Sequence, residues 1–240
     1  MTQNIERTPP AAPDERPGGG LPRQRTVTAR PATPWWRRPW MIPLWVITAA
    51  FLYLQINPFV GTPEAQAPVP PHDSFPPYYT LLIVHMIFGT IAMLTVCLQV
   101  WPWLRRQHPA VHRISGRFYV GASVVAGICG LVIMPFAPAP GKIGVTMSTT
   151  LWVVFTVVGY WAVRNGRYAM HRRYMLYSFA LVMNNVWALF ASKVVFGLEL
   201  SFDFTYFAEG ARWVGWVVNL MAVQWFLYRT ARRPVEGPVR

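Results

Sequence analysis

The segment Tyr78–Leu104 reads "YYTLLIVHMIFGTIAMLTVCLQVWPWL" and contains no Asp, Glu, Lys or Arg. An α-helix rises about 1.5 Å per residue, so about 20 apolar residues cross the roughly 30 Å hydrocarbon core of a bilayer. The segment is therefore predicted to be a transmembrane helix. Directly after it the chain becomes basic, with Arg105 and Arg106 followed by "HPAVHRISGRFYV", His108–Val120.

Similar apolar runs lie on both sides of this segment, and the whole chain is 53% hydrophobic and only 13% charged. A soluble domain carries about 25% charged residues. The composition and the runs together predict an all-α, polytopic transmembrane bundle of six helices. The six predicted runs are Trp40–Ile56, Tyr78–Leu104, Arg117–Met134, Ile143–Val163, Tyr174–Phe196 and Arg212–Tyr228.

Basic residues are distributed unevenly between the two sides of this bundle. All but three of the 22 Lys and Arg residues fall in the N-terminal tail, in the two segments after the second and fourth runs, or after the sixth run. Lysine and arginine accumulate in cytoplasmic segments. We therefore expect a bacterial inner-membrane protein with both termini in the cytoplasm. The three exceptions are Lys142, Lys193 and Arg212.

The ends of the chain differ in composition from the apolar middle. Residues 1–34 are rich in Pro, Gly and Arg and lack apolar periodicity, so we predict a disordered basic cytoplasmic tail. Residues 35–230 form the predicted transmembrane domain, with 78–196 as its core, and 231–240 form a second cytoplasmic tail. The bilayer is the expected partner, a homo-oligomer or another membrane protein stays open, and no nucleic acid is expected.

Polar side chains within the runs are the first candidates for a functional site. His85 lies about 10 Å inside the second run, while Asn185 and Asn219 lie deep in the fifth and sixth. Polar groups at such depth face other helices and have partners. They are predicted either to hold the helices together, or to bind a ligand or handle protons, with haem as one candidate.

His112 and His171 form the second set of candidates, one in each basic segment. One interpretation is that they anchor the helix starts among lipid headgroups. The alternative is haem b held between two helices by these imidazoles, with neighbouring arginines on its propionates. The arginines assigned to headgroups, to propionates or to another anion are Arg113, Arg117, Arg172 and Arg173. If haem is bound, the candidate metal ligands are His85, His112 and His171.

Several other chemistries lack the residues that they need. The sequence has no Cys or His cluster with zinc spacing, and its Gly-rich segment "RPGGGLPR" follows no strand. We assign no catalytic residue and do not expect an enzyme. Three functions stay open: a structural or accessory membrane protein, a b-type haem protein that carries electrons across the bilayer, and a small-solute carrier.

One set of positions resembles a family of bacterial membrane proteins known only as a domain of unknown function. The set consists of His85 with Gly89, then "HPAVHRISGRFYV", then "HRRYM". The resemblance covers roughly Leu82 to Trp187 and leaves out the first and last helices. It implies a polytopic membrane fold, with no assigned activity.

The family's histidines correspond to His85, His112 and His171, and its glycine and arginine correspond to Gly116 and Arg117. The family tends to have Trp where this chain has Tyr174, and Arg where it has Tyr177. The three corresponding histidines support the choice of His85, His112 and His171 as candidate site residues.

Overall fold

The computed structural model describes residues 39–69, 72, 74–137, 140–199 and 203–231, and these residues form helices with no strand. The predicted tail 1–34 and most of the tail 231–240 lie outside them. The α-helices are α1 (Met41–Ile56), α2 (Tyr78–Gln99), α3 (Pro102–Gln107), α4 (Pro109–Ile133), α5 (Lys142–Arg164), α6 (Tyr168–Val182), α7 (Asn184–Gly197) and α8 (Phe204–Thr230). Three short 3-10 turns lie at Asn57–Phe59, Glu64–Gln66 and Met134–Phe136.

Five helical segments of the described chain are long and apolar enough to cross a membrane, which confirms the polytopic all-α prediction. They are Met41–Phe59, Tyr78–Gln99, Pro109–Phe136, Lys142–Arg164 and Tyr168–Val195. Helix α8 spans 27 residues but is not among the five. Its Glu209, Arg212 and Arg229 lower its hydropathy. The count of six membrane-spanning helices therefore stays a prediction.

The helix boundaries differ from the predicted runs at the two basic segments. Proline fits the first turn of a helix, where its missing N–H has no helical partner to lose. Pro102 and Pro109 accordingly begin α3 and α4, so the second run ends at Gln99 and the third begins well before Arg117. Because α6 begins at Tyr168, both His112 and His171 lie on helices rather than in turns.

The predicted fifth run, Tyr174–Phe196, is two helices rather than one. Helix α6 ends at Val182 and α7 begins at Asn184. In an unbroken helix the carbonyl of Ala180 would accept from the N–H four residues later. Here it accepts instead from Nδ2 of Asn219 on α8, at 2.9 Å. A side chain from a neighbouring helix therefore satisfies the backbone at the break, as a membrane interior requires.

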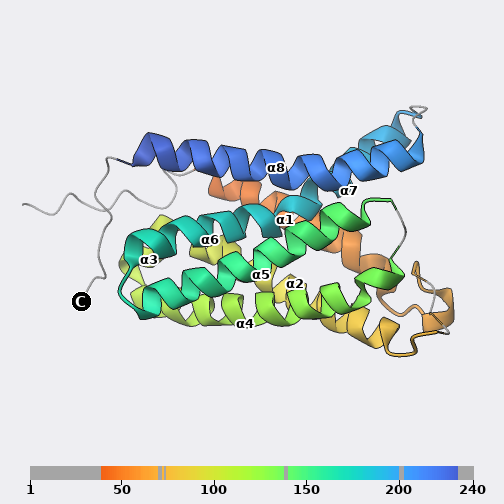
Figure 1. The fold of residues 1–240 in the computed structure, drawn as a ribbon, viewed down its shortest axis with the longest axis horizontal. Coiled ribbons are helices and arrows are strands. Elements are labelled where there is room, and N and C mark those ends of the chain that lie inside the picture. Colours follow the sequence, from red (N-terminus) through yellow and green to blue (C-terminus); the bar gives the residue numbers. More distant parts are fainter. Residues whose placement is uncertain (1–38, 70–71, 73, 138–139, 200–202, 232–240) are drawn as a thin grey trace, which may run out of the picture. The chain divides into compact units, whose positions relative to one another are not determined.

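Helices α2 and α4 form one antiparallel pair and α5 and α6 form another, and α4 packs against α5 to join the pairs (Figure 1). Helix α8 contacts α5, α6 and α7, and α1 contacts α2 and α7. Small residues such as Ala122, Ala126 and Gly130 are buried on α4 and let neighbouring backbones approach. The buried core contains Phe51, Met93, Val96, Cys97, Tyr119, Trp152, Leu181, Val186 and Trp216, among others.

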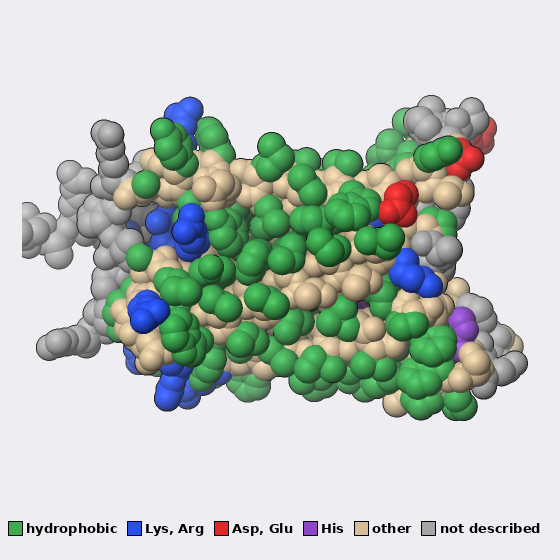
Figure 2. All heavy atoms as spheres, viewed as in Figure 1, with side chains coloured by type: hydrophobic (Ala, Val, Ile, Leu, Met, Phe, Trp, Pro, Cys, Tyr) green, Lys and Arg blue, Asp and Glu red, His purple; other side chains and the backbone are tan. Residues whose placement is uncertain are grey.

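The described charges divide between the two ends of the helices. On the face drawn in Figure 2, Lys and Arg gather mainly at the left end, where α3 lies, and acidic side chains lie at the other end. We call the end formed by α3, the start of α4 and the α5–α6 turn the arginine-rich end. Its charge separation follows the pattern that the sequence predicts.

Candidate functional site

His85 occupies the contact between α2 and α4. Its Nδ1 lies 2.8 Å from the carbonyl oxygen of Ala126. A Cβ added at Gly130 would lie 3.0 Å from the same nitrogen, so the missing side chain of this glycine makes room for the ring. The imidazole therefore ties α2 to α4 with Nδ1 as the hydrogen-bond donor, and Nε2 has no hydrogen bond to any described residue.

His112 and His171 occupy matching positions on α4 and α6. Tyr119 on α4 and Ser178 on α6 share a hydrogen bond of 2.5 Å, so these two helices meet at that level. Each histidine lies seven residues before one of these partners, which is two helical turns, about 10.5 Å, on nearly the same face. Helices α4 and α6 both start at the arginine-rich end, so His112 and His171 occupy matching positions two turns before this hydrogen bond.

The surroundings of the two rings combine partial burial with nearby positive charge. Both histidines are half-buried, and each lies within electrostatic range of Arg105. The two imidazoles also interact electrostatically with each other.

His171 has one ring nitrogen fixed by the backbone. Its Nδ1 lies 2.9 Å from the carbonyl oxygen of Gly159 on α5. A carbonyl can only accept, so Nδ1 carries the proton and Nε2 keeps its lone pair. This arrangement is typical of metal-binding histidines, in which one ring nitrogen donates and the other coordinates.

His112 has a buried nitrogen without a partner. Its Nδ1 is inaccessible to solvent and forms no hydrogen bond within the described part of the chain. Gln99 fixes the backbone beside His112. Its side-chain amide nitrogen, Nε2, donates to the His112 carbonyl at 3.0 Å and to Oγ of Ser115 at 2.6 Å. Nε1 of Trp101 is a second buried atom without a partner near this end of α2. Unpaired buried polar atoms are uncommon in native proteins and call for a partner.

The four arginines proposed from the sequence lie around this end in different settings. Arg113, Arg117 and Arg173 are exposed. Arg172 donates to Oγ1 of Thr230 at 3.1 Å and lies 5.8 Å from the ring of Phe226. The arginine with electrostatic influence on both histidines is Arg105, which the sequence pattern indicated only as a topology signal.

A buried cluster of hydroxyl groups joins α4, α5 and α6. Oγ of Ser178 contacts Tyr119 and also Oγ1 of Thr156, at 2.6 Å, while Nε1 of Trp152 donates to the Tyr119 hydroxyl at 3.3 Å. Oγ of Ser123 is buried nearby on α4 without a described partner. Sequence reasoning missed this cluster, although the spacing of Ser115, Tyr119 and Ser123 on one helical face could have indicated it.

The two asparagines that the sequence indicated, Asn185 and Asn219, have different surroundings in the structure. Asn185 is exposed and the structure brings it to no other candidate, whereas its neighbour Asn184 is buried with Oδ1 unpaired within the described residues. Asn219 is half-buried and bonds both to Ala180 and to Nε1 of Trp187. Neighbouring residues on a helix are rotated by about 100°, so only one of the two asparagines can face α8.

No group of three or more His, Cys, Asp or Glu side chains that could hold a metal ion occurs in the described ranges. A haem needs only two protein ligands, because its porphyrin supplies the other four. His112 and His171 meet that requirement by residue type.

The fold and its polar positions define a polytopic membrane protein with histidines between its helices. The chain belongs to the family described as predicted membrane protein, DUF2306, whose model matches residues 82–227. The expected resemblance ended near Trp187, whereas this match continues through α7 and most of α8. No curated protein and no solved structure matches the chain.

Proposed function

We propose that this protein binds haem b between His112 and His171 and carries electrons at the arginine-rich end of a bacterial inner membrane. The single observation behind the proposal is the matching position of the two histidines, two turns from the Tyr119–Ser178 hydrogen bond. The structural or accessory function and headgroup anchoring do not need two histidines at matching positions of two helices.

The chemistry of His112, His171 and the neighbouring arginines suits a bound haem. His171 has Nδ1 on a backbone carbonyl and Nε2 available, and His112 has an unpaired buried Nδ1 that a ligand-induced rotation of the ring would relieve. Histidine imidazole is among the side chains that hold haem iron in proteins, so these two residues would be its ligands. Arg105, with Arg113 and Arg117 on the same end, would pair with the propionates. When bound, the haem iron supplies one-electron oxidation and reduction.

The chain's own residues would then set the properties of the site. The Gly159 carbonyl fixes the tautomer and orientation of His171, and Gln99 holds the first turn of α4 beside His112. The surrounding apolar helices exclude water. We also propose that the arginine-rich end faces the cytoplasm, because the basic residues Arg105, Arg106, Arg113, Arg117, Arg164 and Arg167 gather there.

An absorption spectrum tests the haem proposal. The full chain is expressed in bacteria supplied with a haem precursor and purified in detergent, and a Soret band that shifts on reduction is expected. His112→Ala and His171→Ala should each remove most of that band.

His108→Ala is the matched control, since His108 is exposed in the same segment and its ring lies edge-on to the ring of Trp103. The control should keep the full band. Absence of the band in the wild-type protein, or its persistence in both single variants, would overturn the proposal and leave the structural function.

A further inference from the structure

The acidic residues of the described chain lie away from the arginines that begin α6 and end α8. The segment 74–198, which contains α2 to α7, has no Asp or Glu. The acidic residues that the structure describes are Glu64, Glu199, Asp203 and Glu209. Even on α8 itself, Arg229 lies about 30 Å along the helix from Glu209. No described carboxylate therefore balances the charge where α6 begins and α8 ends.

Arg172 of α6 is held against the last turn of α8. Its Nη2 donates to Oγ1 of Thr230 at 3.1 Å, and its guanidinium carbon lies 5.8 Å from the ring of Phe226. The hydroxyl of Thr230, which is only 4% exposed, donates to the Phe226 carbonyl at 2.8 Å, so its orientation is fixed. Nε and Nη1 of Arg172 bond to no described residue and are not enclosed by the protein. The guanidinium is thus positioned with donors to spare.

Arg229 supplies a second positive charge at the same end of α8. Its guanidinium carbon lies 4.8 Å from the ring of Trp225. Because residues four apart lie on nearly the same side of a helix, Trp225 and Arg229 share one side, and Phe226 and Thr230 share the adjacent one. Arg172 and Arg229 therefore lie on adjacent sides of one helix end, each against an aromatic ring. Figure 1 shows that α8 ends at the arginine-rich end.

Exposed apolar side chains lie beside these two arginines on α8. Met221 is 66% exposed and Trp225 is 60% exposed. Tryptophan and tyrosine gather where a membrane meets water, and Tyr228 is also exposed here. A soluble anion would contact only the arginines, whereas a phospholipid would also place its chains against the apolar side chains.

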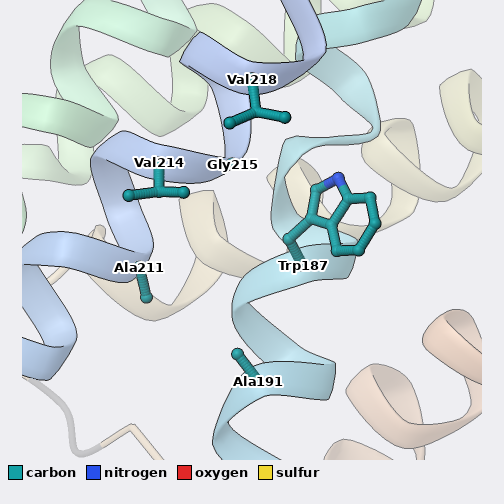
Figure 3. Close-up of a pocket in the computed structure, with 6 residues that line it drawn as sticks. All are labelled: Trp187, Ala191, Ala211, Val214, Gly215 and Val218. Atoms are coloured by element: carbon teal, nitrogen blue, oxygen red, sulfur yellow. The ribbon is translucent and has the colours of Figure 1, made fainter.

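The first half of α8 has no comparable charge on its contact with α7. Figure 3 shows the apolar pocket between the two helices, which is lined by Trp187, Ala191, Ala211, Val214, Gly215 and Val218. None of these side chains can bind a phosphate. A charged headgroup is therefore expected at the end of α8 and not at this pocket.

We propose that Arg172 and Arg229 bind the phosphate of an anionic phospholipid of the phosphatidylglycerol type. Arginine forms charge-assisted hydrogen bonds with phosphate, and its planar group loses little freedom for each bond. A zwitterionic lipid is less suitable, because the cation beside its phosphate is repelled by the two arginines. The haem proposal uses neither of these arginines, so either proposal can fail alone.

Titration of the detergent-purified full chain with phosphatidylglycerol, followed by native mass spectrometry, tests the proposal. Phosphatidylcholine with the same chains should bind more weakly. Arg172→Gln should lower the affinity for phosphatidylglycerol about fiftyfold. About fivefold comes from one basic charge near the headgroups, and about tenfold from the lost charge-assisted hydrogen bonds.

Arg173→Gln is the matched control, because it removes the same charge from the next residue of α6, which is exposed. It should lower the affinity by about fivefold at most. Equal losses in the two variants, or equal binding of the two lipids, would overturn the proposal in favour of unspecific charge attraction. Inorganic phosphate that binds alone as tightly as the lipid would overturn it in favour of a soluble anion.

Thr230→Val tests the positioning of Arg172 without any change of charge. The loss of one net hydrogen bond should lower the affinity for phosphatidylglycerol about fivefold. Thr150→Val is its control, since the Thr150 hydroxyl also donates to the carbonyl four residues earlier, at 2.8 Å, but at an exposed position of α5. This control should bind as the wild-type protein does. Unchanged binding in Thr230→Val, at an unchanged melting temperature, would contradict a site built on the positioned Arg172.

Discussion

Tyr119 and Ser178 join α4 to α6 through a hydrogen bond of 2.5 Å, and both side chains are fully buried. Thr156 and Trp152 of α5 bond to the same pair. The contact therefore aligns three helices, and His112 and His171 each lie two helical turns before it on α4 and α6. In a membrane, where apolar side chains gain little by leaving lipid, such polar contacts help to specify the packing.

Replacement of Tyr119 by Phe should weaken this alignment. The change keeps the ring but removes the hydroxyl that bonds to Ser178 and accepts from Trp152. Hydrogen bonds between transmembrane helices average about 0.6 kcal/mol and reach about 1.7 kcal/mol, so we expect a loss of that order for each bond. Unfolding in mixed detergent micelles measures it. Tyr160→Phe is the control, because Tyr160 is 37% exposed on α5, and it should change the free energy of unfolding little.

His85→Leu should destabilise the α2–α4 contact without affecting the proposed haem. The variant loses the hydrogen bond to the Ala126 carbonyl but keeps an apolar side chain against Gly130. We expect a stability loss of about 1 kcal/mol and an unchanged Soret band. A band that disappears in this variant, in protein that remains folded, would show that His85 is a ligand.

Gly130→Ala should be destabilising, because its Cβ would lie 3.0 Å from Nδ1 and 3.1 Å from Cε1 of His85. The ring would have to move and lose its hydrogen bond geometry. Gly121→Ala on the same helix meets nothing within 4 Å and provides the comparison. A gain of up to about 1 kcal/mol from higher helix propensity is expected there. Equal effects of the two changes on thermal unfolding would contradict the close packing of His85 on Gly130.

The proposed cytoplasmic location of the arginine-rich end can be tested with reporter fusions. Green fluorescent protein fused after Arg240 should fluoresce, because its fluorescence requires folding inside the cell. Alkaline phosphatase fused at the same point should be inactive. Phosphatase fused in the segment after Ile56 should be active. An active phosphatase at the C-terminus would reverse the proposed orientation or show that α8 does not cross the membrane.

The sequence by itself determined the class of the protein and the approximate membrane segments. Runs such as Tyr78–Leu104 have no favourable alternative to a helix in lipid, because hydrocarbon offers no partner for an unpaired backbone. Clustered arginines likewise separated the two ends of the bundle. These properties depend on one segment at a time, and hydropathy and charge report them directly.

Only the tertiary structure decided which polar groups meet. The break at Met183 depends on Asn219, which lies in another helix and supplies the missing donor to Ala180. The burial of Asn184 rather than Asn185 depends on the rotation of α7 against Gly215. Similarly, the matching positions of His112 and His171 follow from the contact between Tyr119 on α4 and Ser178 on α6. Helix rotation is set by contacts with neighbouring helices, since the surrounding lipid is nearly indifferent to which apolar face it touches.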